Sequence, residues 1–249
     1  MKFKTIALAA LLATTGSAFA EIQTGQTGSF GEAELVFIAT NSKGSFLKDL
    51  GVTANAFQSN GNFNFSVQGA EWDKFVAFGG SDTKWTVLAA NPLGFGFEPG
   101  EINLFTTVGA GQAANGINNQ VFNDAVNNLA SIFVTSDDIA TNTGIGADNI
   151  ELAQAAGSDG YLAGYINLAG FYNQVGSVNE TLKMAYLTSS NDNGSSLVLA
   201  SPYVNASTEV SFNGTSIAAV TAPVPEPSTY ALLLAGLCAV GFMVRRRQS

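Results

Sequence analysis

An uninterrupted apolar run of about 15 residues, from Tyr230 to Val244, lies close to the C-terminus. A helix satisfies the backbone hydrogen bonds of such a run internally, so the run can enter a bilayer. At about 1.5 Å per residue it spans roughly 22 Å, less than the roughly 30 Å hydrocarbon core, so the adjoining arginines must reach toward the headgroups. These are Arg245, Arg246 and Arg247. We therefore expect a transmembrane helix over 230–244, with its C-terminal end in the cytoplasm.

The residues on both sides of this run follow a specific order. Pro225, Glu226 and Pro227 precede it, and the arginine cluster 245–247 closes it. In these three parts and their order, residues 223–249 resemble the PEP-CTERM sorting signal of Gram-negative bacteria. The resemblance implies that exosortase, a membrane protease-transpeptidase, recognises Pro225, Glu226 and Pro227, removes the helix and releases or transfers the body. The alternative is a permanent, proline-capped membrane anchor.

The N-terminus has the order of a secretory signal peptide. Lys2 and Lys4 precede an apolar stretch over 6–13, and small residues stand at Ala18 and Ala20. This order predicts a signal peptide over 1–20, export through the Sec machinery, and cleavage after Ala20 by signal peptidase. The protein should then be anchored in the inner membrane until its tail is processed, and afterwards lie at the cell surface or in the extracellular matrix.

Between the two signals, residues 21–222 are long enough for one sizeable domain. This body holds five lysines against 18 acidic residues, because one of the 19 acids in the chain, Glu226, lies in the tail. Its net charge of about −13 repels phosphate backbones, so we expect no nucleic-acid partner. The single cysteine, Cys238, falls in the apolar run, so packing must stabilise the body without disulfides.

Short apolar segments separated by Gly, Asn, Ser or Pro predict a mostly β body. The clearest alternation is Phe63, Phe65 and Val67 against polar neighbours, the pattern of a half-buried strand. We expect a single β-sandwich or jelly-roll-like domain with one or two short helices. The predicted strands are 33–40, 62–68, 74–78, 85–90, 101–108, 161–168, 181–188, 196–200, 208–213 and 216–221.

One longer segment has helical rather than strand periodicity. Over 115–133 an apolar residue recurs every four positions, which predicts a helix, and a weaker pattern predicts another over 148–156. The apolar positions of the longer segment are Ile117, Val121, Ala125, Leu129 and Phe133. The proline-rich stretch 221–228 is expected to be a linker.

The body lacks the side chains of common catalytic machinery. It has no histidine and no cysteine, so serine and cysteine hydrolase mechanisms and zinc sites lose their usual groups. We therefore expect no enzyme and no cofactor. Carboxylates remain: Asp137 with Asp138, Asp148 with Glu151, Asp159 alone, and Glu98 with Glu101. A calcium site in the oxygen-rich turns is a further alternative. Its candidate ligands are Asp137, Asp138, Asp148, Asn149, Asp159 and Asp192.

Two tryptophans, Trp72 and Trp85, are either core residues or part of a sugar-stacking face. The phenylalanines that would complete such a face are Phe75, Phe78, Phe95 and Phe97. The leading expectation is a structural or adhesive protein that contacts exopolysaccharide in a biofilm matrix. The alternative is a carbohydrate-binding module or a carboxylate-dependent glycosidase on a β-sandwich; exposure of both tryptophans in one groove beside two acids would favour it, and burial of both would count against it.

Overall fold

The computed structural model describes residues 22, 32–91, 97–109, 117–143, 150–162, 175–202, 208–221 and 237. Strands outnumber helices in this part of the chain, which confirms the mostly β expectation. The strands are β1 (Glu34–Asn41), β2 (Gly44–Thr53), β3 (Phe63–Ser66), β4 (Lys84–Asn91), β5 (Asn103–Val108), β6 (Glu151–Ala155), β7 (Gly176–Ser177), β8 (Thr181–Thr188), β9 (Leu199–Pro202), β10 (Thr208–Phe212) and β11 (Ser216–Thr221). The helices are α1 (Ala54–Asn60), α2 (Ala70–Ala77) and α3 (Asn119–Thr143).

The described strands join into one antiparallel sheet of 11 strands rather than the two sheets of a sandwich. Its order is β3-β11-β10-β8-β5-β4-β1-β2-β6, with β7 added beside β4 and β9 beside β8. Chain neighbours pair through hairpins at β1–β2, β4–β5 and β10–β11. The expected two-sheet sandwich is therefore corrected to a single continuous sheet.

This sheet curls so that one face closes on itself. In sheet order β1 and β10 are separated by β4, β5 and β8. A flat sheet would hold them roughly 19 Å apart, because neighbouring strands lie about 4.8 Å apart. Yet the ring centroids of Phe37 on β1 and Phe212 on β10 lie 4.9 Å apart. The inner face therefore encloses a core of its own, as a sandwich would.

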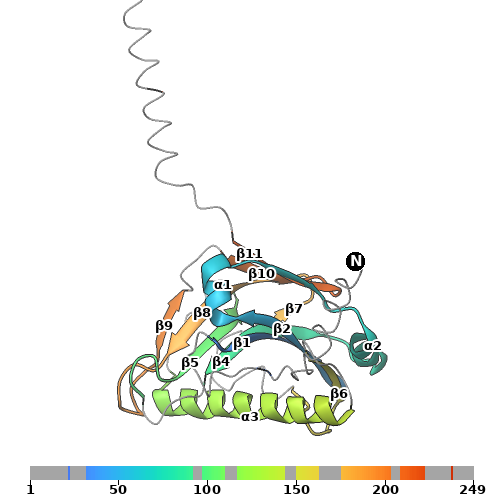
Figure 1. Cartoon of the computed structure of the whole chain (residues 1–249), viewed down its shortest axis with the longest axis horizontal. Helices are drawn as coiled ribbons and strands as arrows, with labels where there is room; N and C mark the ends of the chain where they lie inside the picture. Colours follow the sequence, from blue (N-terminus) through green and yellow to red (C-terminus); the bar gives the residue numbers. More distant parts are fainter. Residues whose placement is uncertain are drawn as a thin grey trace, which may run out of the picture.

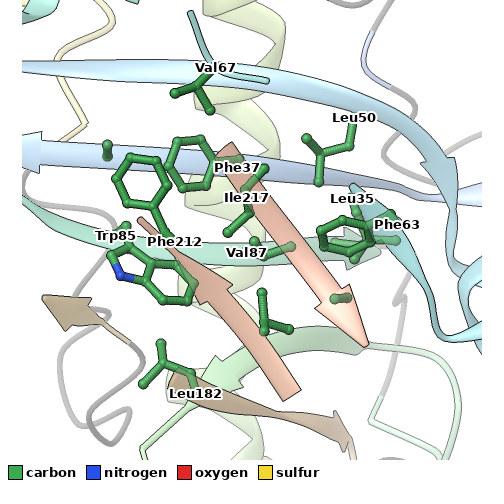
Figure 2. Close-up of a cluster of buried hydrophobic side chains, with 14 of the residues drawn as sticks. Leu35, Phe37, Leu50, Phe63, Val67, Trp85, Val87, Leu182, Phe212 and Ile217 are labelled. Atoms are coloured by element: carbon green, nitrogen blue, oxygen red, sulfur yellow. The ribbon is translucent and has the colours of Figure 1, made fainter. Parts of the chain in front are cut away.

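The inner core combines large aromatic side chains with aliphatic ones (Figure 2). Phe212 contacts Trp85 with ring centroids 6.2 Å apart and Trp72 with centroids 5.6 Å apart. Phe57 on α1 extends the cluster to Phe105 on β5. Burying side chains of this size supplies much of the hydrophobic stabilisation, and edge-to-face ring pairs add to it.

The outer face of the sheet has a second core, covered by α3, which runs along the lower side of the sheet in Figure 1. Phe122, Val126, Leu129 and Phe133 are buried there at helical spacing. Asn118 caps the helix, because its side-chain oxygen accepts a hydrogen bond from the Val121 N–H at 2.9 Å. The predicted helix is confirmed but extends to Thr143.

In the first half of α3, the buried stripe is shifted by one residue from the predicted stripe. Val121 was expected in it, but this side chain is 43% exposed, and its neighbour Phe122 is buried instead. Leu129 and Phe133 are shared by both stripes. A spacing of four residues drifts around a helix with 3.6 residues per turn, and so a strict four-residue repeat leaves the buried face.

Two predicted elements have the wrong type. The predicted strand 74–78 lies mostly in the helix α2, where Trp72 and Phe75 bury one face and Glu71 and Asp73 occupy the first turn. The predicted helix 148–156 contains β6, in which Leu152 faces the outer core and Ala153 the inner core. Both errors involve short segments, for which period alone separates helix from strand poorly.

The remaining expectations divide into three groups. Strands over 181–188 and 216–221 are confirmed as β8 and β11, and those over 33–40, 62–68, 85–90, 101–108 and 208–213 within a few residues. The strand predicted at 196–200 begins later, as β9. The one predicted at 161–168 lies almost wholly outside the described residues. The strand β2 and the helix α1 were not expected, and three helices replace the expected one or two within the described part of the chain.

Candidate functional site

The candidate sugar-stacking tryptophans belong to the inner core. Trp85 is fully buried, and its indole N–H donates to the backbone oxygen of Ser177 at 2.8 Å. Trp72 is 8% exposed and packs against Phe46 and Phe75. Of the other aromatics, Phe75 is buried, Phe78 and Phe97 are partly buried against the two cores, and Phe95 lies outside the described residues. These tryptophans do not form an exposed stacking face.

The neighbouring acids also take structural roles. Glu98 and Glu101 form a turn in which the Glu98 N–H donates to the Glu101 carboxylate at 3.0 Å. Glu151 forms an ion pair with Lys48, its partner across the β2–β6 ladder. Asp148 lies outside the described residues. Asp137 is 9% exposed and accepts a backbone hydrogen bond from a distant residue, whereas its neighbour Asp138 is not buried.

Among the described residues, the structure does not bring the candidate calcium ligands together into a metal site. No group of three or more acidic, histidine or cysteine side chains within the described residues is arranged to hold a metal ion. Asp192, for example, accepts a hydrogen bond from the Phe97 N–H at 3.4 Å. Asp159 is exposed in the turn after β6. Asn149 and Asp148 lie outside the described part, so the six predicted ligands are not tested as a set.

The N-terminal end of the body is fixed by a contact that the sequence did not predict. Ile22 is 2% exposed and joins the outer core under α3. Its N–H donates to both carboxylate oxygens of Asp137, at 3.2 and 3.3 Å. The two residues are 115 positions apart. Nothing in the local sequence around either residue signals a pairing over that separation.

The C-terminal end of the body is fixed just as firmly, at Thr221 on β11. Its N–H donates to the Asn62 side-chain oxygen at 2.8 Å, and its hydroxyl lies 2.7 Å from that of Thr208. The same hydroxyl donates to the Gly61 backbone oxygen at 3.2 Å. The described fold thus ends shortly before Pro225, so the predicted linker over 221–228 starts from a rigid attachment.

The predicted processing residues all lie outside the described part of the chain. They are Ala18 and Ala20 at the signal cleavage site, and Pro225, Glu226, Pro227, Arg245, Arg246 and Arg247 in the tail. The expected transmembrane helix 230–244 lies outside it too, apart from Leu237. Where the structure describes the chain, none of its helices combines the length and apolar character that a membrane span requires.

Comparison with known proteins identifies the tail. Residues 223–247 match the family model of the PEP-CTERM protein-sorting motif. This motif is typical of exported proteins of Gram-negative bacteria, and it implies exosortase as a processing partner. The body is not assigned to a family by this match. No curated protein and no solved structure matches the chain significantly.

Proposed function

We propose that this protein is a structural or adhesive component of the extracellular matrix or cell surface, delivered there by exosortase. The observation that carries the proposal is the match of residues 223–247 to the sorting motif, at the end of a chain whose first 20 residues read as a secretion signal. The body is a non-enzymatic domain that contacts exopolysaccharide after its tail has been processed.

Three features of the body support this proposal over a glycosidase or a carbohydrate-binding module. Both tryptophans are buried, and so they are not available to stack on a sugar ring. Glu98 and Glu101 hydrogen-bond within their own turn. Glu151 pairs with a lysine.

A reproducible hydrolysis of matrix polysaccharide that is lost in Glu98→Gln or Glu101→Gln would contradict the proposal.

The sorting step is tested in the native host with Glu226→Ala. The substitution removes the central carboxylate of the Pro-Glu-Pro element, and we expect the tail to be retained and most of the protein to stay in the inner membrane. Intact mass and cell fractionation measure both results. Ser228→Ala is the matched control, because it changes the same stretch but leaves the element intact. An unaltered mass and location in Glu226→Ala would contradict exosortase processing.

A further inference from the structure

Asparagine followed by glycine occurs at three places in the described chain: Asn60–Gly61, Asn193–Gly194 and Asn213–Gly214. In such a pair the backbone nitrogen of the glycine can attack the side-chain carbonyl carbon of the asparagine, because glycine has no Cβ to obstruct it. A five-membered succinimide ring forms and ammonia leaves. Water then opens the ring to aspartate or to isoaspartate, in which the main chain runs through the former side chain. All three asparagines are exposed, so exposure does not distinguish between them.

Two of these pairs are held in a form that opposes ring closure. Asn60 is the last residue of α1, and the N–H of the glycine after it donates to the Phe57 backbone oxygen at 2.6 Å, so the attacking nitrogen is engaged. The Asn213 side-chain oxygen accepts four hydrogen bonds in the turn between β10 and β11. The donors are the backbone N–H and the hydroxyl of Thr215 and of Ser216, at 2.8 to 3.2 Å. Each bond that must break makes ring closure slower.

The reacting atoms of the third pair are less engaged. The Asn193 side-chain oxygen accepts one hydrogen bond, from the Ser195 N–H at 3.0 Å. Within the described structure the Gly194 N–H, which carries the attacking nitrogen, donates no hydrogen bond. We propose that Asn193 is a site of spontaneous deamidation, and that isoaspartate at this position loosens the attachment of α3 to the loop after β8. The inference concerns the folded body alone and is independent of the proposed function.

The loop that contains Asn193 holds the start of α3. The buried side-chain amide of Asn119, the first residue of α3, donates to the Asn193 backbone oxygen at 2.9 Å. The Gln120 N–H donates to the Gly194 backbone oxygen, also at 2.9 Å. Isoaspartate turns the Asn193 backbone carbonyl into a free carboxylate and lengthens the main chain by one methylene group before Gly194. The two acceptor oxygens then no longer have the spacing that fits the first two residues of α3.

The test follows the protein purified from its native host during incubation at mildly alkaline pH, with peptide mapping by mass spectrometry. We expect conversion at Asn193 to be about tenfold faster than at Asn60 or Asn213, which have additional hydrogen bonds to break. Gly194→Ala is the matched variant. Gly194 does not have a positive φ, and an added Cβ would meet its nearest atoms at 3.4 Å, an ordinary van der Waals distance, so the fold is kept. The methyl group obstructs the attack and should slow conversion severalfold.

Hydrogen exchange measures the structural consequence. The Gln120 amide should exchange faster in the incubated protein than in the fresh one, and the incubated Gly194→Ala variant should not show this change. Conversion at Asn60 or Asn213 that keeps pace with Asn193, or equal conversion with and without Gly194→Ala, would overturn the modification site. Conversion at Asn193 with unaltered exchange at Gln120 would overturn its effect on α3.

Discussion

Asp49 is a carboxylate on β2 with only 1% of its surface exposed. It accepts a hydrogen bond from the Gly51 N–H at 2.8 Å. Burial raises the pKa of Asp49 above its ordinary value of 3.8, although that hydrogen bond and the charge of Lys48 both lower it. The folded protein therefore binds this proton more tightly than the unfolded chain does. The resulting stabilisation is complete below pH 3.8 and is lost as the pH rises through the raised pKa.

Asp49→Asn removes this titration but keeps a side-chain oxygen for Gly51. We expect the free energy of unfolding of the variant, relative to that of the unaltered protein, to increase as the pH rises from about 3 to 7. Urea unfolding at a series of pH values measures the difference. A difference that is constant over this range, or that falls, would show that Asp49 is not held in a protonation-favouring environment.

Ser136 on α3 is fully buried, and within the described structure its hydroxyl has no hydrogen-bond partner. An unpaired buried hydroxyl costs about 1 to 3 kcal/mol, so Ser136→Ala should raise the free energy of unfolding by roughly 1 kcal/mol. Ser131→Ala, at an exposed position of the same helix, is the control for helix propensity. If thermal and urea unfolding show no larger gain for Ser136→Ala than for Ser131→Ala, the hydroxyl is bonded in solution.

At the scale of elements, α2 protects one edge of the sheet. The edge strand is β6, and α2 lies beside it in Figure 1. The Ala153 N–H donates to the Glu71 carboxylate of α2 at 2.8 Å. A sheet edge with unsatisfied N–H groups can pair with other chains, and a covering helix prevents this.

Glu71→Ala removes the acceptor for Ala153. We expect a loss of about 1 to 2 kcal/mol in the free energy of unfolding, and faster hydrogen exchange at the Ala153 amide. Lys74→Ala is the control, because it breaks the ion pair with Glu71 at a lysine whose side chain is 48% exposed, and it should cost less than about 1 kcal/mol. Similar losses in the two variants, with unaltered exchange at Ala153, would mean that Glu71 acts through the ion pair alone.

The sequence predicted strands of two kinds, those with alternating burial and those that form continuous apolar runs, such as β1 and β4. In β8 and β10, buried side chains alternate with exposed ones, and both strands were found. The missed strand β2 is largely buried too, but Lys48 and Asp49 in its middle interrupt the apolar run. The predicted strand 74–78 lies mostly in α2, which is too short to show a clear helical repeat.

At the scale of the whole molecule, Phe212 packs where the curled sheet brings distant elements together, and we expect it to stabilise the curl. It contacts Phe37, Trp72 and Trp85, which come from β1, α2 and β4. Phe212→Ala would leave a cavity between these elements, and we expect it to cost about 3 to 5 kcal/mol, measured by urea unfolding. Val220→Ala, at a side chain that is 61% exposed on β11, should change stability by less than about 0.5 kcal/mol. If Phe212→Ala lowers the free energy of unfolding by less than about 1.5 kcal/mol, contacts of other residues stabilise the curl.

The curl could not be predicted, and neither could the site contacts that depend on it. Local periods indicate which side chains are buried, but two apolar faces of separate sheets and one face of a curled sheet produce the same alternation. The approach of Phe37 to Phe212 and of Ile22 to Asp137 is set by the tertiary fold over long sequence separations. The sorting tail could be predicted, because the order of its residues is a local pattern in the sequence.

The chain leaves the described fold from an interior strand. β11 lies between β10 and β3, and it is hydrogen-bonded to both. Its last residue, Thr221, is also tied to Gly61 and Asn62. A mechanical force applied through the C-terminal end therefore acts on two strand ladders and this anchor together, so extracting β11 requires both ladders to break. A body tethered by its tail would resist drag and shear better than one that ended on an edge strand.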